Sequence, residues 1–379
     1  MKTSFFRRFA GSIALLLSIF TAAWLIGCTA AAFVSPLRSK YLALFTLTTP
    51  FAVLANIAVL LFWLLFARRK WRIIIPLLAL GFSYKIIPTI FGWHYFQHQE
   101  LFSGDSRLKV MSWNVHGMGI FDRPTNRTTD DRIIQMIKAE APDILCLSEF
   151  YTMYDNALKP YSTALMQACG FREFRFKSDN TLGTKIFLGI AIFSRYPISN
   201  FHVFPLHTRH DGQVDVQLLQ YDLQLPDSQT VRVFFTHLQS FLLSDGEKTY
   251  LEEVKMRNRE TVVKVSKTYV RRFSEAYVKR AIQADTAAAI IAQSPFPVVI
   301  CGDFNDLPGS YTYMKMRGEL DDAFVQHGAG FGRSYNRFSP TMRIDYIFYD
   351  PEAMKILGFR TPATSLSDHN PVIANFELK

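Results

Sequence analysis

The sequence predicts a layered α/β or α+β domain that follows three transmembrane helices. Two observations predict this arrangement. Residues 1–104 of the 379-residue chain contain three long apolar stretches that are nearly free of charge. Residues 105–379 contain no such stretch and instead alternate short apolar runs with helical patterns, which is typical of strands packed with helices. We therefore expect a membrane anchor in residues 1–104 and a soluble domain in residues 105–379.

The three apolar stretches cover residues 10–34, 41–67 and 71–91. Each is close to the roughly 20 residues that a helix needs to cross a bilayer. Of the 42 basic and 32 acidic residues in the chain, ten and one lie in residues 1–104, which leaves 32 and 31 in the soluble domain. The net charge of +10 is therefore a signal of membrane topology rather than of a nucleic-acid partner.

The basic residues also predict the orientation of the anchor. The N-terminus carries three of them, the first loop two, and the second loop, ARRKWR, four. Short loops rich in Lys and Arg face the cytoplasm. We therefore expect the N-terminus and the 68–72 loop in the cytoplasm, and the soluble domain on the extracytoplasmic side.

The cysteines leave one alternative open. Residues 25–28, LIGC, resemble a bacterial lipoprotein cleavage box that ends at Cys28. We favour an ordinary cysteine within a transmembrane helix, because two further spans already anchor the chain, and both interpretations place the soluble domain on the same face. Cys146, Cys169 and Cys301 show no metal-ligand spacing. Cys146 and Cys301 lie in apolar runs and are expected to be buried free thiols.

Eight strands are expected in the soluble domain, because their sequences are rich in Val, Ile and Phe and end at Gly, Pro, Asp or Asn. They cover residues 108–113, 143–148, 186–194, 216–225, 231–237, 296–302, 343–350 and 371–378. Helical patterns cover residues 130–140 and about 246–292, and no internal repeat is present.

Polar residues suited to acid, base or metal chemistry follow these strands or, in one case, lie within one. They are Asn114, Glu149, His237, Asp303, Asn305, Asp345, Asp368 and His369. A buried strand does not tolerate an unpaired carboxylate, so a shared hard cation with histidine and amide partners is the simplest way to stabilise this set. Taken alone, Asn114 is explained as a turn former and His237 as a core histidine. Their joint occurrence is what indicates a site.

In this order, the motifs resemble the endonuclease/exonuclease/phosphatase superfamily, which includes pancreatic-type deoxyribonuclease, abasic-site endonucleases, neutral sphingomyelinases and inositol-polyphosphate 5-phosphatases. The resemblance runs from Leu108 to Phe376 and includes the segments GIAIFSRYPIS and GDFNDLPGSYTY. It implies a four-layer sandwich, in which two mixed β-sheets pack face to face with helices outside. This fold agrees with the strands expected independently.

The resemblance also implies metal-assisted attack of water on a phosphate ester. Glu149 would be the principal ligand of a Mg²⁺ or Mn²⁺ ion, with Asn114 and Asp368 nearby, because hard ions prefer oxygen ligands. Asp303 would orient the attacking water and accept its proton, and Asn305 would hold that water or a phosphate oxygen.

The histidines complete the implied site. His369 would bind the scissile phosphate or take part in proton transfer, and His237 would contact the phosphate from the other side. Asp345 would hydrogen-bond His369, fix its tautomer and stabilise its charged form. Neighbours on an extended backbone point to opposite sides, so Asp368 would reach the metal while His369 reaches the phosphate.

We therefore expect a metal-dependent phosphoesterase, in the form of a phosphodiesterase, in the multi-pass inner membrane of a bacterium with its catalytic domain extracytoplasmic. The anchor favours phospholipid or sphingolipid headgroups as substrate, and the breadth of the family leaves nucleic acid as the alternative. A non-catalytic membrane receptor or scaffold is a second alternative, against which the intact set of polar residues argues. No obligate protein partner is evident.

One basic segment is left over. Residues 248–280 hold ten Lys and Arg against four Glu, interleaved with aromatic and aliphatic residues. The plain interpretation is a solvated amphipathic helix. The functional alternatives are a lid that touches anionic lipid headgroups and a surface that grips nucleic-acid phosphates.

Overall fold

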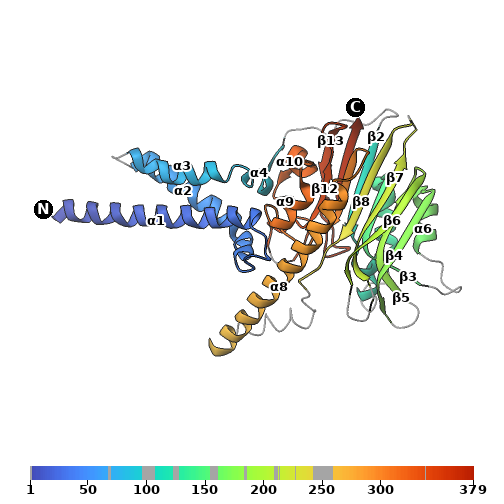
Figure 1. The fold of residues 1–379 in the computed structure, drawn as a ribbon, viewed down its shortest axis with the longest axis horizontal. Helices are drawn as coiled ribbons and strands as arrows, with labels where there is room; N and C mark the ends of the chain where they lie inside the picture. The colour runs from blue at the N-terminus through green and yellow to red at the C-terminus, as the bar shows by residue number, and fades with distance from the viewer. Residues whose placement is uncertain are drawn as a thin grey trace. The chain divides into compact units, whose positions relative to one another are not determined.

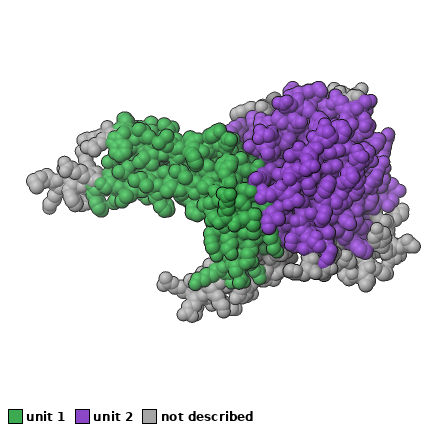
Figure 2. All heavy atoms as spheres, viewed as in Figure 1, with its two compact units in different colours: residues 1–90, 240–281, 307–314 green, residues 91–239, 282–306, 315–379 purple. Residues whose placement is uncertain are grey.

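The computed structural model of the chain describes residues 2–66, 70–95, 107–122, 128–153, 161–182, 186–208, 212, 214–226, 228–241, 259–337 and 339–379. Two units are distinguished, coloured separately in Figure 2. The first comprises residues 1–90, 240–281 and 307–314, and the second comprises residues 91–239, 282–306 and 315–379. The boundary expected between residues 104 and 105 lies outside the described residues.

The first unit begins with apolar helices. They are α1 (Lys2–Phe33), the 3₁₀ helix η1 (Leu42–Thr48), α2 (Thr49–Phe66), the 3₁₀ helix η2 (Lys70–Ile73), α3 (Ile74–Phe82) and α4 (Ile87–Ile90). Within the described part of the chain, two helical stretches are long and apolar enough to cross a membrane, Gly11–Phe33 and Leu42–Phe66. They correspond to the first two expected spans.

The expectation of a third uninterrupted helical span was wrong. Helix α3 has nine residues, which at 1.5 Å per residue is about 14 Å and half the thickness of a bilayer core. It ends at Phe82, and the hydroxyl of the next residue, Ser83, donates a hydrogen bond to the carbonyl of Ala79. Turns separate α3 from α4. The interruption covers residues 83–86, SYKI, whose single charge lies within an otherwise apolar stretch, so hydropathy averaged over the stretch did not reveal it.

Polar side chains connect these helices to one another. The indole N–H of Trp63 in α2 donates to the hydroxyl of Ser18 in α1 at 2.7 Å, and Asn56 donates to the carbonyl of Thr21 at 2.8 Å. The turn after α3 is tied to α1 as well, through the hydroxyls of Thr29 and Ser83 at 2.7 Å. These three hydrogen bonds join the helices through uncharged groups.

The second unit contains two six-stranded sheets (Figure 1). The first has the order β10 (Asp321–Asp322), β12 (Asp345–Tyr349), β9 (Val298–Asp303), β8 (Thr230–His237), β7 (Val214–Gln224) and β6 (Ile198–Thr208). The other has the order β13 (Met354–Arg360), β14 (Val372–Leu378), β2 (Arg107–Asn114), β3 (Ile144–Met153), β5 (Ile186–Ser194) and β4 (Glu173–Leu182). A small separate ladder joins β1 (Gly92–Trp93) to β11 (Ala329–Gly330).

Both large sheets are mixed, because β2 pairs in parallel with β3, and β8 with β9, while their other described pairings are antiparallel. All eight expected strands are present. In these two sheets β4, β6, β10 and β13 were not expected, and neither were β1 and β11 of the small ladder. The predicted fold class of two mixed sheets flanked by helices is therefore confirmed for this unit.

Alternate residues of β2 pack in two different cores, as the two-residue period of a strand requires. Leu108 and Val110 of β2 pack in the cluster that includes Val233 and Val299 of the other sheet. The next residues on the opposite face, including Met111, pack in the cluster beneath two helices. The sheets therefore face each other across one core, and a second core lies between one sheet and its helices.

Helices α5 (Thr129–Glu140) and α6 (Tyr161–Cys169) cover that second core. Helix α5 matches the helix expected at 130–140. The other helices are η3 (His116–Asp122), α8 (Arg259–Ile291), α9 (Tyr311–Arg317) and α10 (Ala323–His327). Of the helix expected at 246–292, residues 259–291 are helical, and residues 246–258 lie outside the described residues. All four cysteines are free and buried.

Candidate active site

The strand ends bring the predicted polar residues into one neighbourhood of the second unit. Asn114 ends β2, His237 ends β8, Asp303 ends β9 and Asp345 begins β12. The strand register makes Asp303 the direct partner of His237 in the parallel ladder and of Asp345 in the antiparallel ladder. Residues 305, 368 and 369 lie in the loops that follow β9 and precede β14.

Glu149 is the exception, because it lies within β3 rather than at its end. The register between β3 and β5 shifts between Leu147 and Phe150, and Glu149 has a φ of 50°. A β-bulge re-aims one side chain and is enriched next to active sites, and a non-glycine residue at positive φ stores strain. Leu147 and Phe150 are fully buried, whereas the side chain of Glu149 is 35% exposed.

Asn114 connects the two sheets at this point. Its Nδ2 donates to Oε1 of Glu149 at 2.9 Å and to Oδ2 of Asp303 at 3.1 Å. The amide is buried, and one carboxylate comes from each sheet. Asn114 therefore fixes the separation of two carboxylates that belong to different sheets.

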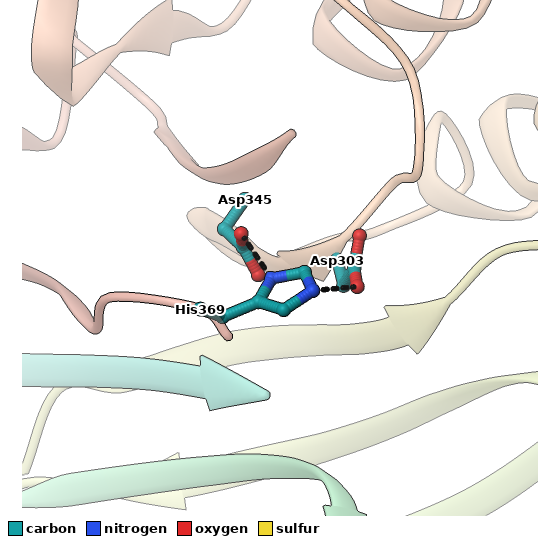
Figure 3. Close-up of side chains that lie close together, drawn as sticks. All are labelled: Asp303, Asp345 and His369. Atoms are coloured by element: carbon teal, nitrogen blue, oxygen red, sulfur yellow. Dashed lines mark hydrogen bonds and ion pairs between the residues drawn. The ribbon is translucent and has the colours of Figure 1, made fainter. Parts of the chain in front are cut away.

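His369 lies between two buried carboxylates (Figure 3). Its Nδ1 is 2.9 Å from Oδ2 of Asp345, within hydrogen-bond distance, and its Nε2 is 3.7 Å from Oδ2 of Asp303. The expected hydrogen bond between Asp345 and His369 is thus present. Side chains of these three residues are at most 6% exposed.

The charges in this row perturb one another. Burial lowers the pKa of His369, but the charges of Asp345 and Asp303 and the hydrogen bond to Asp345 outweigh it and raise the pKa to about 10. Burial and the charge of Asp345 raise the pKa of Asp303 to about 6, against the opposing effects of the nearby histidines and of the Asn114 hydrogen bond. At neutral pH the imidazole is therefore charged, and the Asp303 carboxylate can both accept and release a proton.

His237 lies on the other side of Asp303. Its Nε2 is 3.7 Å from Oδ2 of Asp303 and 4.0 Å from Oε1 of Glu149. It is partly exposed rather than sealed in the core. The explanation of His237 as a core histidine therefore does not fit its surroundings.

His116 is a site residue that the sequence reasoning missed. Its Nδ1 is 3.5 Å from Oε2 of Glu149 and 3.7 Å from Oδ1 of Asp368. The signal was its position two residues after Asn114, in the same strand-end segment, WNVHG. Burial raises the pKa of Glu149, but the hydrogen bond from His116, the charge of His237 and the Asn114 hydrogen bond prevail and lower it to about 2.

Asp368 and His369 are adjacent in sequence and contact different groups. Asp368 lies near His116 and, through its Oδ2, 3.5 Å from Nε of Arg337. The loop that carries both residues is fastened to β2, because the indole of Trp113 donates to the carbonyl of His369 and the hydroxyl of Ser367 donates to the carbonyl of Asn114. The loop therefore has a fixed position beside the strand end.

Asn305 supports Asp303 through the backbone. It has a φ of 52°, and its N–H donates to Oδ1 of Asp303 at 2.9 Å. Its side-chain amide donates to the carbonyl of Leu238, the residue that follows His237. Asn305 thus ties the carboxylate of one strand end to the end of its neighbour.

Two groups of residues offer ligands for a metal ion. Asp303, Asp345 and His369 have ligand atoms within 4.8 Å of one another. In this row, however, the imidazole occupies the space between the carboxylates and is charged, so a cation would have to displace it. Glu149 and Asp368 present carboxylate oxygens at less buried positions. They lie near the buried amide of Asn114, whose Nδ2 donates to Glu149 and whose Oδ1 accepts from the N–H of His116. Glu149 is ionised throughout the physiological range, so these two carboxylates fit a hard divalent cation better.

Comparisons with known proteins agree with this geometry. The model of the Endonuclease/Exonuclease/phosphatase family matches residues 111–369, a range that contains every residue of the site described above. Residues 11–90 match a second family, described as Domain of unknown function (DUF8431). None of the curated proteins compared with this chain matches it.

Solved structures share the fold of the second unit. An endonuclease/exonuclease/phosphatase from Beutenbergia cavernae DSM 12333 is 22% identical, with a TM-score of 0.51 over 72% of each chain. The human Nocturnin catalytic domain with bound sulfate anion is 17% identical, with a TM-score of 0.50 over 73% of this chain and 97% of that one. A family protein from Bacteroides thetaiotaomicron is 16% identical, with a TM-score of 0.50 over 71% and 94%.

The family match covers more than half of the chain, and it coincides with the two sheets and with the polar residues at their ends. Structures of the same family have the same fold. The chain belongs to the Endonuclease/Exonuclease/phosphatase family.

Proposed function

We propose that this chain is a membrane-anchored, metal-dependent phosphodiesterase that hydrolyses phospholipid or sphingolipid headgroups. The observation that carries the hydrolase assignment is the row of Asp345, His369 and Asp303. It supplies a fixed cation and a carboxylate with a pKa of about 6 next to the carboxylate of Glu149. A cationic group and a base held side by side are what attack on an anionic phosphate ester requires.

Each residue of the row has a separate task in the proposal. Asp303 accepts the proton of the attacking water, and Asn305 keeps its carboxylate oriented. His369 donates a hydrogen bond to a phosphate oxygen from Nε2, because its Nδ1 is engaged by Asp345. His237 binds the phosphate from the other side of Asp303.

The residues that would hold the metal are Glu149, Asn114 and Asp368. A bound Mg²⁺ or Mn²⁺ ion neutralises phosphate charge and stabilises the leaving oxygen. Asn114 keeps the carboxylates of Glu149 and Asp303 at a fixed separation. The metal ligand and the base that deprotonates water therefore stay at a constant distance from each other.

The substrate assignment is supported by surface chemistry. Large apolar side chains of α1 and α2 are exposed, such as Leu16, Phe20 and Leu65, and a surface of that kind requires lipid rather than water around it. Residues 105–379 are nearly neutral in charge, whereas proteins that grip duplexes neutralise many phosphates with Lys and Arg. A domain held at a bilayer also meets headgroups at high local concentration.

The orientation of the anchor follows from its third segment in this proposal. The guanidinium of Arg72 donates to the carbonyl of Gly11, and Ser83 bonds Thr29. Residues 72–83 therefore run beside α1 from near its start toward its end, in the same direction as α1. With a return along α2, the proposal has a third crossing made by α3, the turns at residues 83–86 and α4 together, although no single helix among them spans the bilayer. The catalytic domain then lies on the side opposite the N-terminus.

A substrate panel tests the function. The full chain in detergent should hydrolyse bis-p-nitrophenyl phosphate in Mg²⁺ faster than p-nitrophenyl phosphate, and lose this activity in excess EDTA. Release of headgroups from vesicles, with no cleavage of single- or double-stranded DNA and RNA, supports the lipid assignment. Cleavage of nucleic acid alone favours the nuclease alternative, and inactivity on every ester with the metal bound favours the non-catalytic receptor.

Protease accessibility tests the orientation. In cells stripped of any outer membrane, added protease should remove the catalytic domain and leave the 68–72 loop intact. Survival of the domain until the inner membrane is breached contradicts the proposed orientation, and with it an extracytoplasmic lipid substrate.

A further inference from the structure

His116 lies between two carboxylates that are proposed to hold the cation. Its Nδ1 is 3.5 Å from an oxygen of Glu149 and 3.7 Å from an oxygen of Asp368. Neighbouring ligands of one six-coordinate ion with bonds near 2.1 Å are about 3 Å apart. Each carboxylate is therefore within about 1 Å of the separation from His116 that two ligands of one ion would have, and both would have to turn toward the imidazole for all three to share an ion.

The backbone holds this imidazole in place at a cost in strain. Four successive residues, 116–119, have positive φ values of 44°, 68°, 51° and 76°. Two of them, His116 and Met118, are not glycine, and such conformations persist where the surrounding structure enforces them. The N–H of His116 donates to Oδ1 of Asn114, and the turn continues with the N–H of Met118 on the carbonyl of Val115.

The other site histidines are placed differently. His369 directs its two ring nitrogens at Asp345 and Asp303. His237 approaches Glu149 only to 4.0 Å and is nearer to Asp303. His116 alone among these three contacts both Glu149 and Asp368, and it is 24% exposed, so an ion can reach it from solvent.

We infer that His116 is a nitrogen ligand of the catalytic cation, and that it makes the site prefer first-row transition ions, such as Mn²⁺, over Mg²⁺. The inference rests on the proposed function, because it concerns the ion of the same site. Imidazole binds transition ions better than it binds Mg²⁺, for which carboxylate, carbonyl and water oxygens are the usual ligands. A ligand set of oxygen atoms and one imidazole nitrogen therefore binds Mn²⁺ more strongly, relative to Mg²⁺, than a set of oxygen atoms alone.

The test is magnetic resonance of Mn²⁺ bound to the full chain in detergent, in which electron spin echo modulation detects a directly coordinated ¹⁴N. Wild-type protein should show imidazole nitrogen. The signal should disappear in His116→Asp, which keeps a ligand at this position but offers only oxygen, and persist in the matched variant His237→Gln. Competition between Mg²⁺ and Mn²⁺ should show the preference for Mn²⁺ falling about tenfold or more in His116→Asp.

The outcomes separate this inference from the function on which it rests. Stoichiometric Mn²⁺ binding without nitrogen in the wild type overturns the role of His116 and leaves the metal-dependent hydrolase standing. If the nitrogen signal disappears in His237→Gln and persists in His116→Asp, the role of His116 is overturned in favour of His237. Failure of Mn²⁺ to bind at all overturns both, and the wild-type spectrum decides even if a variant does not fold.

Discussion

The apolar helices and the β-sandwich differ in which side chains are buried and which are exposed. In the helices Ser18 and Asn56 are fully buried, while Leu65 is 74% exposed. In the sandwich the buried side chains are mainly Leu, Val, Ile and Phe, and charged groups such as Asp303 are buried mostly where a partner lies beside them. The sandwich has the arrangement expected in water, and the helices have the one expected for the membrane anchor proposed above.

The difference also concerns what the buried polar groups do. Those of the helices are neutral and bond hydroxyls and carbonyls of adjacent helices. Those of the sandwich include ions whose pKa values shift because they face one another. Removal of a partner should therefore cost little stability among the helices and much at a buried ion pair of the sandwich, while substitutions in the site should act mainly on the rate.

The largest effect is expected from the carboxylates of the site. Glu149→Ala and Asp303→Ala should each lower kcat/KM on bis-p-nitrophenyl phosphate by about 10³-fold, which corresponds to about 4 kcal/mol. Each change removes a charge that acts in the transition state, so circular dichroism and the melting temperature should stay near the wild-type values. Full activity in either variant, or in excess EDTA, contradicts the assigned site.

A buried ion pair away from the site should come next. Nε and Nη2 of Arg232 donate to the buried carboxylate of Asp222 at 2.6 and 2.9 Å. Arg232→Met removes the cationic partner of this buried carboxylate and should lower the free energy of unfolding by about 3 kcal/mol. The control is Arg175→Met, which breaks a more exposed pair with Glu173 and should cost under about 1 kcal/mol in the same thermal unfolding measurement.

Asp345→Asn should have a smaller effect on rate, with a distinctive pH dependence. In the wild type, activity should rise as Asp303 loses its proton near pH 6 and fall as His369 loses its proton near pH 10. The charge of Asp345 raises both pKa values, so its removal should move both limbs of the profile to lower pH. We expect a rate loss of about tenfold to a hundredfold, and an unchanged profile would count against this role of Asp345.

The smallest effect is expected among the helices. Asn56 donates to the carbonyls of Thr21 and Ala52, and hydrogen bonds between transmembrane helices contribute about 0.6 kcal/mol on average. Asn56→Leu should therefore change stability by about that amount and leave hydrolysis of the soluble ester unchanged. A loss as large as that of Arg232→Met would mean that the helices are not surrounded by lipid.

The sequence revealed the centre of each sheet and missed its edges. All eight expected strands are inner strands, and the four that were not expected, β4, β6, β10 and β13, are the outermost strands of the two sheets. Inner strands are buried on both faces and read as apolar runs, whereas edge strands carry charges, proline or few residues. Strand β6 contains Pro205, and β4 carries the polar sequence KSDN.

The sequence also named most of the residues that the structure brings together in the candidate site, and their roles stay predictions. Polar residues at the ends of apolar strands could be recognised because their burial costs free energy unless they have partners. Their order along the chain also resembled that of a known family. His116 was not identified, because its two carboxylate partners lie 33 and 252 residues further along the chain. These contacts arise from the parallel pairing of β2 with β3 and from the loop before β14. A local sequence pattern cannot predict them.

The strand that carries the bulge at Glu149 should open more slowly than the loops of the site. After the bulge, β3 resumes its pairing with β5 from Phe150 to Met153, so Glu149 is held by hydrogen-bonded strand on both sides. Sheet interiors open with free energies that approach global unfolding. Amide hydrogens that flank Glu149 should therefore exchange with solvent as slowly as those at the centre of the sheet. In the proposed metal site, Glu149 would then be the most rigidly held ligand, and the residence time of a bound ion would be set at His116 and Asp368, which lie outside the strands.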